Sequence, residues 1–200
     1  MTRLVLATRN PHKVEELEAI LSSAGLSVEL VGLSAFPAVP DVVEDGLTFD
    51  ANALKKARAA VEATGLPAVA DDSGLCVDVL NGMPGVFSAR WAGRHGDDDA
   101  NLDLLLAQLS DVGDEHRGAH FACAAALVEP SGQQHVVEGR IDGVLLREPR
   151  GSAGFGYDPI FRPAGQRHTT AEMTAAEKNA ISHRGLAFSG LAPVIRALPR

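Results

Sequence analysis

The sequence predicts an α/β fold with a mixed β-sheet, and three features lead to this expectation. Short apolar runs alternate with stretches of helical period in the N-terminal half, which is typical of parallel strand–helix units. Two long apolar runs then follow one another with only a short turn between them, which predicts a hairpin in the same sheet. The 200 residues contain no internal repeat and no clear linker, so we expect a single domain over residues 1–200 with a cleft.

The chain is predicted to begin with a strand, a helix and a second strand. Leu4–Ala7 is a short apolar run of strand length. Asn10 is a suitable N-cap and Pro11 suits the first helical position, after which apolar residues recur at helical spacing until Gly25. A glycine commonly ends a helix, and Ser27–Leu33 is then predicted as the second strand.

The next segments are predicted as a loop, a helix and a strand. The segment over 36–46 is acidic and contains prolines, which favours a loop. The alanine-rich stretch Thr48–Thr64 is predicted as a helix, because Gly65 follows it as a stop signal. Ala68–Ala70 is expected to form a short strand that leads into an acidic turn over 71–74.

The C-terminal half carries further strand and helix signals. In chain order we expect a half-buried strand through Leu75, Val77 and Val79, an irregular segment over 81–96, a helix over 102–109, paired strands over 120–128 and 135–146, a glycine-rich loop over 147–156, a helix opened by the capping box Thr174–Glu177, and a last helix for which Ser182 is a candidate cap.

Composition and charge limit the classes of function. Hydrophobic residues make up 46% of the chain and charged residues 22%, which is typical of a soluble globular protein. The formal net charge of −8 disfavours binding of DNA or RNA through a basic face. No apolar run approaches the roughly 20 residues of a membrane span, and none resembles a signal peptide. We therefore expect a cytoplasmic protein with no membrane partner.

The turn between the first strand and the first helix is a candidate phosphate site. The N–H groups and the dipole at a helix N-terminus attract anions, and Lys13 can neutralise a phosphate there. An ordinary capped helix with a surface lysine explains the same residues, and the glycines of a Walker A loop are missing. The candidate substrate-binding residues here are Thr8, Arg9, Asn10, Pro11, His12 and Lys13.

The adjacent carboxylates Asp71 and Asp72 form a candidate metal site. Oxygen ligands suit Mg²⁺, which usually takes few protein carboxylates and keeps several waters. Glu44 is a candidate second acid, and Ser73 a candidate phosphate or metal-shell contact. Taken alone, the two aspartates are more commonly explained by a simple acidic turn that ends a strand.

Two later segments are candidates for binding a nucleobase. Aromatic residues make up only 4% of the chain, yet two of them lie in the loop segment Phe155-Gly156-Tyr157-Asp158. A base can stack on an aromatic face while Asp158 or the backbone contacts its edge. Burial in the core is the alternative for Tyr157. His183 and Arg184 offer two donors side by side, and Lys178 adds a cation.

Several of these blocks recur in one order in the Ham1 family of inosine/xanthosine triphosphate pyrophosphatases, which this chain resembles over nearly its whole length. The blocks are Ala7-Thr8 with Asn10 and Lys13, Gly46–Phe49 with Asn52-Ala53, Ala70–Leu75, Ser88–Arg90, Gly154–Phe161 and Ile181–Gly185. Two departures are small: Arg9 replaces a frequent glycine or asparagine, and Trp91 a frequent tyrosine.

The resemblance implies a long mixed sheet flanked by helices, with two lobes around a central cleft. It implies a Mg²⁺-dependent homodimer that hydrolyses non-canonical purine nucleoside triphosphates (ITP, dITP and XTP) to the monophosphate and pyrophosphate. It also implies roles for residues: proton acceptor and metal ligand for Asp72; metal ligand for Glu44; phosphate contacts for Thr8 to Lys13, Lys56 and Ser73; nucleoside contacts for Phe155, Gly156, Tyr157, Asp158, Lys178, His183 and Arg184.

The expected reaction is attack of water on the α-phosphorus, with Asp72 taking the proton. Donors at His183 and Arg184 would favour a purine with an acceptor at position 6 over adenine, which has a donor there. Two alternatives remain at this point: a nucleotide sensor without catalysis, and a pyrophosphatase for other modified nucleotides. A dinucleotide-binding dehydrogenase is disfavoured because its glycine motif is missing.

Overall fold

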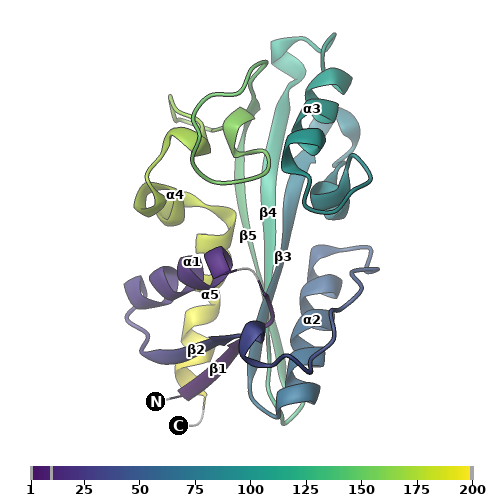
Figure 1. The fold of residues 1–200 in the computed structure, drawn as a ribbon. Helices are drawn as coiled ribbons and strands as arrows, with labels where there is room; N and C mark the ends of the chain where they lie inside the picture. The colour runs from purple at the N-terminus through teal and green to yellow at the C-terminus, as the bar shows by residue number, and fades with distance from the viewer. Residues whose placement is uncertain (1, 10, 199–200) are drawn as a thin grey trace. The chain divides into compact units, whose positions relative to one another are not determined.

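A mixed sheet of six strands organises the described part of the chain (Figure 1). The strands are β1 (Thr2–Leu6), β2 (Val28–Gly32), β3 (Ala68–Val77), β4 (Gly118–Val128), β5 (Gln134–Leu145) and β6 (Phe161–Pro163). Their order in the sheet is β2-β1-β3-β4-β5-β6. β1 pairs in parallel with both β2 and β3, whereas β6 pairs antiparallel with β5. The α/β class and the mixed sheet predicted from the sequence are therefore confirmed.

The structure is a computed structural model that describes residues 2–9 and 11–198. Its α-helices are α1 (Pro11–Ser23), α2 (Phe49–Thr64), α3 (Asp98–Gln108), α4 (Ala175–Ile181) and α5 (His183–Ala197). Short 3₁₀ turns occur between these elements, the longest over Gly85–Arg90. None of the helices in this part of the chain has the length and hydropathy needed to cross a bilayer.

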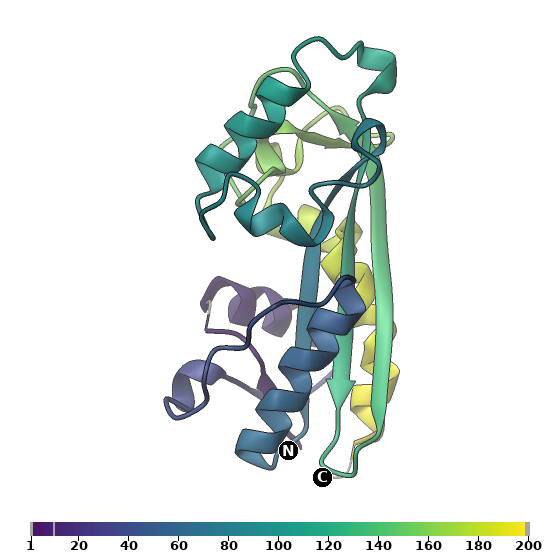
Figure 2. The ribbon, with the colours of Figure 1, turned by 90° about the vertical axis from the view of Figure 1, so that its right-hand side faces the viewer.

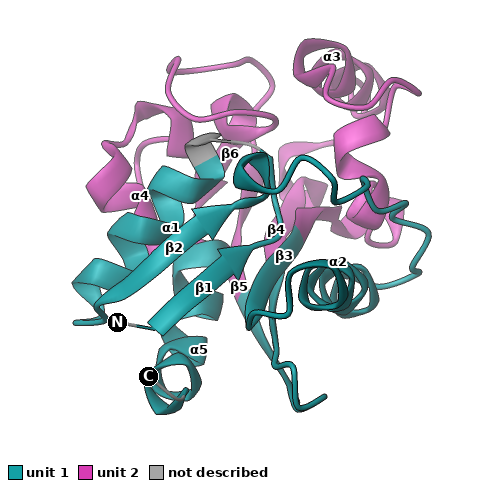
Figure 3. Cartoon of the chain, turned by 60° about the horizontal axis from the view of Figure 1, so that its bottom comes forward, with its two compact units in different colours: residues 1–72, 123–139, 184–200 teal, residues 73–122, 140–183 magenta. Residues whose placement is uncertain are grey.

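The chain divides into two compact units (Figure 3). Unit 1 consists of residues 1–72, 123–139 and 184–200, and unit 2 of residues 73–122 and 140–183. β3, β4 and β5 each contribute residues to both units. The candidate phosphate and metal residues except Ser73 belong to unit 1, together with Arg184. Ser73 and the other candidate nucleoside residues apart from Arg184 belong to unit 2.

The alternation of side chains along β1 divides the core of unit 1 into two layers. Leu4 and Leu6 are buried against α1 and α5, whereas Val5 is buried with the alanines of α2. Successive side chains of a strand point to opposite faces of a sheet, so the two sets cannot mix. Figures 1 and 2 accordingly show α2 on one side of these strands and α5 on the other.

Unit 2 has a core of its own that is richer in aromatic residues. Phe121 of β4 and Phe161 of β6 pack edge to face with their ring centroids 4.7 Å apart. Tyr157 and Ile160 are buried in the same cluster, together with Leu105 of α3. This packing fixes one side of the loop that carries the predicted nucleobase residues.

Two helices begin where their sequence signals predict. The Thr48 side chain accepts a hydrogen bond from Ala51 N and caps α2, and Gly65 ends that helix in the left-handed region at φ 68°. Thr174 and Glu177 form the predicted reciprocal capping box at the start of α4. These signals are local, which explains why the sequence alone reveals them.

The predicted acidic turn over 71–74 is wrong. β3 runs without interruption from Ala68 to Val77, so Asp71, Asp72 and Ser73 lie within a strand. Aspartate and glycine are depleted in strands, which is why the sequence favoured a turn. The strand continues because distant cations balance the buried charge of Asp71 (4% exposed).

Smaller differences concern elements with weak sequence signals. The strand predicted through Val79 ends at Val77, and Val79 lies in a 3₁₀ turn with 46% of its surface exposed. The segment predicted to be irregular over 81–96 contains the 3₁₀ helix Gly85–Arg90. The three-residue strand β6 is too short to be recognised by alternation.

The packing of α5 leads to a stability prediction. Leu191 is fully buried in the core of unit 1, whereas Leu186 on the same helix is 47% exposed. Leu191→Ala should lower the free energy of unfolding by about 2–5 kcal/mol, because it removes buried methyl groups and leaves a cavity. Leu186→Ala is the matched control, and its cost should stay below about 1 kcal/mol. Urea denaturation measures both, and equal losses would contradict this description of α5.

Candidate active site

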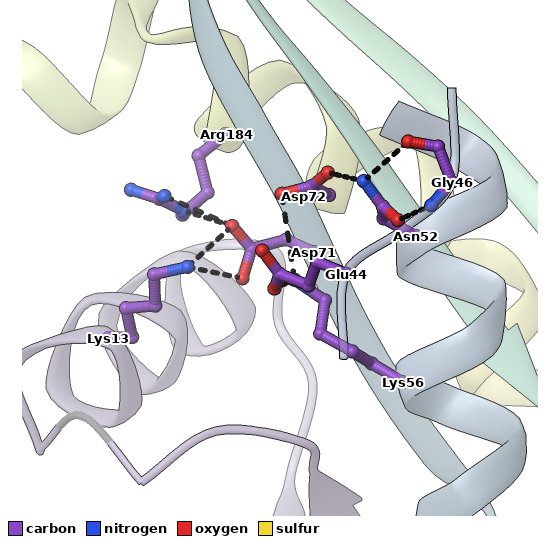
Figure 4. A network of polar contacts seen from close by, with 8 residues as sticks. All are labelled: Lys13, Glu44, Gly46, Asn52, Lys56, Asp71, Asp72 and Arg184. Carbon is purple, nitrogen blue, oxygen red and sulfur yellow. Dashed lines mark hydrogen bonds and ion pairs between the residues drawn. The ribbon is translucent and has the colours of Figure 1, made fainter. Parts of the chain in front are cut away.

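Asp71 of β3 is the centre of an ion-pair network in unit 1 (Figure 4). The Lys13 ammonium of α1 lies 3.3 and 3.2 Å from its two carboxylate oxygens. The Arg184 guanidinium of α5 donates to Asp71 Oδ2 from Nε at 3.1 Å and from Nη2 at 3.0 Å. Arg184 Nη1 also donates to Glu16 Oε2 of α1 at 2.9 Å. The network thus joins β3 to the first and last helices.

Asp71 is ionised at all ordinary pH values. Its burial would raise the pKa, but the charges of Lys13, Arg184 and Lys56 outweigh burial and hold the pKa far below its usual range. Burial likewise opposes the charge of Arg184, yet Asp71 and Glu16 raise the pKa of its guanidinium. Permanent charges with this many partners are suited to a structural role.

Asp72 points to the opposite face of β3 and contacts the side chains of α2 (Figure 4). Asn52 Nδ2 donates to Asp72 Oδ2 at 2.9 Å. The Lys56 ammonium lies 3.6 Å from Asp72 Oδ1 and 2.6 Å from Glu44 Oε1. Asn52 and Lys56 lie four residues apart on one face of α2, as their spacing predicts.

The pKa of Asp72 is shifted in the opposite direction to that of its neighbour. Burial is the largest cause of the rise, and the carboxylates of Glu44 and Asp71 add to it, although Lys56 and Asn52 act against them. The Lys56 pKa is raised because the three carboxylates outweigh its burial. A carboxylate whose pKa is raised toward neutrality is better matched to accepting a proton than its strongly acidic neighbour.

The carboxylates of Glu44 and Asp72 are candidate metal ligands. Both carboxylates lie within ion-pair distance of one ammonium group, that of Lys56. Across residues 2–9 and 11–198, no group of three or more metal-ligating side chains is found. Two carboxylates are nevertheless enough for Mg²⁺, which commonly takes its remaining ligands from water and substrate phosphates. The donor set therefore fits this ion.

The predicted phosphate turn connects β1 to α1. Thr8 follows β1, and its carbonyl accepts a hydrogen bond from Leu33 N at 3.0 Å. Lys13 lies in the first turn of α1 and faces Asp71. Asn10 lies outside the described residues, as do the side chains of Pro11 and His12. Phosphate binding by this turn stays a prediction.

Arg9, where the chain departs from the Ham1 pattern, holds the loop that follows β2. Its Nε donates to Asp41 Oδ1 at 2.9 Å, and its two terminal nitrogens donate to the carbonyls of Leu33 and Val39. The loop over 36–46, predicted as irregular, contains no helix or strand. The Arg9 side chain thus supplies hydrogen bonds to backbone carbonyls in and just before this segment, which has no regular backbone hydrogen bonding of its own.

In unit 2, Asp158 organises the loop that carries the candidate nucleobase residues. Its carboxylate is buried and accepts hydrogen bonds from Phe155 N at 2.9 Å and from Thr170 Oγ1 at 2.8 Å. The Lys178 ammonium lies 2.5 Å from Asp158 Oδ2. A Cβ at Gly154 would overlap this carboxylate, so only glycine fits there.

The aromatic residues of this loop differ in their exposure. Phe155 is 50% exposed, and the Lys178 ammonium lies 5.1 Å from the centre of its ring. Tyr157 is only 4% exposed, and its hydroxyl donates to the carbonyl of Ser88 at 3.0 Å. Of the two aromatic residues predicted to bind a base, Phe155 is therefore the partly exposed one, whereas Tyr157 is part of the core.

His183 is held by an aromatic ring of β4. Its imidazole is stacked on Phe121, with ring centroids 4.9 Å apart and planes inclined by 11°. The residue is 8% exposed. Ser73 lies next to Asp72 in β3 and is half-buried. Substrate contacts of His183, Arg184 and Ser73 stay predictions.

Three residues of these networks were not identified as functional from the sequence. Asn52 belongs to a block that resembles the Ham1 family but was assigned no role, although it holds Asp72. Glu16 and Phe121 gave no signal beyond a helix surface and an apolar strand, yet they support Arg184 and His183. Only Asn52 carried a usable signal, because it belongs to a block of the family resemblance and is a polar residue four positions before Lys56 in an alanine-rich helix.

Known proteins are similar to this chain over almost its entire length. Residues 4–194 match the model of the Ham1 family. A dITP/XTP pyrophosphatase of Streptomyces coelicolor is 68% identical over 198 residues, covering 99% of both chains. A crystal structure of a nucleoside-triphosphatase / dITP/XTP pyrophosphatase from Mycobacterium abscessus is 56% identical, has a TM-score of 0.79, and covers 96% of this chain and 100% of its own. A HAM1 protein from Coxiella burnetii is 42% identical, has a TM-score of 0.89, and covers 99% and 100% respectively.

The opposite environments of Asp71 and Asp72 lead to a paired prediction. Asp71→Asn should lower the free energy of unfolding at pH 7 by about 3–5 kcal/mol, because the half-buried Lys13 loses the carboxylate it pairs with and the buried Arg184 keeps only Glu16. Asp72→Asn should change it by less than about 1 kcal/mol or raise it, because burial already disfavours the ionised form. Urea unfolding of both variants checks this, and a loss in Asp72→Asn equal to that in Asp71→Asn would contradict it.

Repeating the unfolding measurement across pH tests the opposite directions of the Asp71 and Asp72 pKa shifts. The folded pKa of Asp71 is lowered, so its stabilisation is present above the unfolded value near 3.9 and is lost as pH falls below about 4. Asp71→Asn should therefore lose less stability than the parent in that acid range. The folded pKa of Asp72 is raised, so the parent loses stability as pH rises from about 4 toward the raised value. Asp72→Asn should remove that decline.

Proposed function

The chain belongs to the Ham1 family, and from this premise we propose that it hydrolyses non-canonical purine nucleoside triphosphates such as dITP, XTP and ITP. The products are the nucleoside monophosphate and pyrophosphate. The observation that carries the proposal is the position of Asp72, which lies between Lys56 and Asn52 with a raised pKa. Relatives that are 68% and 66% identical carry the name dITP/XTP pyrophosphatase.

In the proposed reaction, a water oxygen attacks the α-phosphorus. The bond from the α-phosphorus to the bridging oxygen breaks, and pyrophosphate leaves with the electron pair of that bond. The proton of the water passes to Asp72, whose raised pKa suits it to receiving it. Asp71 has no part in this transfer, because Lys13 and Arg184 keep it strongly acidic.

We propose Glu44 and Asp72 as the protein ligands of Mg²⁺. When bound, this ion supplies charge compensation for the phosphate oxygens and lowers the pKa of a coordinated water. Lys56 contacts both carboxylates and has a raised pKa, so it stays positively charged. Lys56 and Lys13 then stabilise the negative charge that develops on the leaving pyrophosphate.

We assign the nucleoside to residues of unit 2. Phe155 offers an exposed ring for stacking, and the loop that carries it is fixed by Asp158. His183, oriented by Phe121, would donate to the acceptor at purine position 6 of inosine or xanthine. Arg184 already donates to Asp71 and Glu16, so its side chain mainly anchors α5 beside this histidine.

The setting of the enzyme is also part of the proposal. We expect a homodimer in the cytoplasm, where the nucleotide pool is found and where removal of deaminated purines has a use. Exposed apolar side chains at Val79, Met83 and Phe87 in unit 2 offer surface for such an interface. Analytical ultracentrifugation determines the oligomeric state directly.

The decisive experiment is a pyrophosphate-release assay over a panel of nucleotides. The parent protein with Mg²⁺ should turn over dITP, XTP and ITP much faster than ATP or GTP. Removing Mg²⁺ with a chelator should abolish release, and Asp72→Asn should lower kcat by a factor of about 10² to 10⁴. Near-normal turnover by Asp72→Asn, or no release from any purine triphosphate, would refute the proposal.

The same assay tests how the base is selected. His183→Ala should lower the ITP/ATP ratio of kcat/KM by about tenfold or more, because one donor to position 6 is lost. Phe155→Leu is a suitable comparison, since it should weaken binding of all purines alike by removing the stacking ring. A ratio unchanged by His183→Ala would place the discrimination on other residues.

A further inference from the structure

Asn52 is a buried polar residue whose hydrogen bonds are divided between two parts of the proposed active site. It lies in the first turns of α2 and is 1% exposed. Its Nδ2 donates to Asp72 Oδ2 at 2.9 Å, and its Oδ1 accepts from Gly46 N at 2.8 Å. A further contact from Nδ2 to Gly46 O measures 3.4 Å. One amide thus connects the reactive strand with the loop that carries Glu44.

The chemistry of the partners fixes the orientation of this amide. An ionised carboxylate only accepts hydrogen bonds, so the NH₂ group of Asn52 faces Asp72. A backbone N–H only donates, so the amide oxygen faces Gly46. Neither aspartate nor alanine can make both contacts, and glutamine would extend the chain by one methylene in a buried site.

Gly46 is the complementary half of this contact. A Cβ at position 46 would lie 2.5 Å from Asn52 Oδ1 and 3.1 Å from Ala51 Cβ. The loop can approach Asn52 closely only because residue 46 has no side chain. Glu44 is two residues away in the same loop and pairs with Lys56 at 2.6 Å, so the position of Gly46 limits where Glu44 can lie.

The two carboxylate oxygens of Asp72 consequently have different partners. Oδ2 is held by Asn52, whereas Oδ1 lies 3.6 Å from the Lys56 ammonium, which also pairs with Glu44. Loss of the amide would therefore free the carboxylate to rotate.

We propose that Asn52 is a positioning residue of the active site, which fixes the orientation of Asp72 and, through Gly46, its separation from Glu44. This role rests on the proposed function, because it concerns the acid and the metal ligands of that reaction. Asn52 acts on these groups and needs no contact with substrate.

The central test is Asn52→Ala, compared with Asn101→Ala as a matched control. Asn101 is equally buried, lies in the first turns of α3, and accepts a hydrogen bond from Ala92 N at 2.7 Å, without any contact to a carboxylate. Asn52→Ala should lower kcat by a factor of about 10 to 100, since a hydrogen bond to a charged group is lost. It should also raise the Mg²⁺ concentration needed for half-maximal rate. Asn101→Ala should alter only stability.

Gly46→Ala provides a second variant that leaves the amide in place. Its new Cβ collides with Asn52 Oδ1, so it should reproduce the loss in kcat and the changed Mg²⁺ dependence. In the Asn52→Ala background that oxygen is gone, so adding Gly46→Ala should cost much less than it does alone. Such non-additivity is expected of two residues that act through one contact.

A measurement without substrate keeps the positioning role separate from the proposed reaction. Mg²⁺ binding measured by calorimetry without nucleotide should be weaker in Asn52→Ala than in the parent and unchanged in Asn101→Ala. If the parent releases no pyrophosphate, the proposed function fails while this result still judges Asn52. An unchanged Mg²⁺ affinity in Asn52→Ala, or a kcat loss equal to that of Asn101→Ala, would overturn the inference.

Discussion

The structure depends on a carboxylate buried in the middle of a strand. Asp71 is 4% exposed, and an isolated charge at such depth would cost several kcal/mol. Lys13 from the first helix and Arg184 from the last helix compensate this cost, and Arg184 also binds Glu16. A single buried charge therefore ties the two ends of unit 1 to β3. It also explains why a segment with poor strand propensity continues as a strand.

The alternation of side chains along β3 separates a structural acid from a reactive one. Val69 and Asp71 face the layer of α1 and α5, whereas Ala70 and Asp72 face α2. Asp71 meets two cations, but Asp72 shares one lysine with Glu44 and receives an amide hydrogen bond. Two identical side chains that are neighbours in sequence thus acquire opposite pKa shifts because a strand turns them to different faces.

The range of an interaction along the chain determines how much of it could be predicted from the sequence. The caps at Thr48 and Thr174 act over three residues, so the starts of α2 and α4 were predictable. Asp71, in contrast, is balanced by residues 58 and 113 positions away, which no local pattern reveals. The candidate residues were found by their chemical type and by the family resemblance, whereas their supports, such as Asn52, depend on tertiary contacts.

In both units, a loop that carries candidate site residues is held by a buried polar side chain that hydrogen-bonds its backbone. In unit 1 the amide of Asn52 binds the backbone at Gly46, and in unit 2 the carboxylate of Asp158 binds the backbone at Phe155. Each contact requires a glycine, Gly46 or Gly154, because a Cβ would overlap the buried polar group. These loops cannot use the hydrogen-bond ladder of a sheet, so a buried side chain must satisfy their backbone. Substituting either glycine therefore acts on the site although neither residue has a side chain to bind anything.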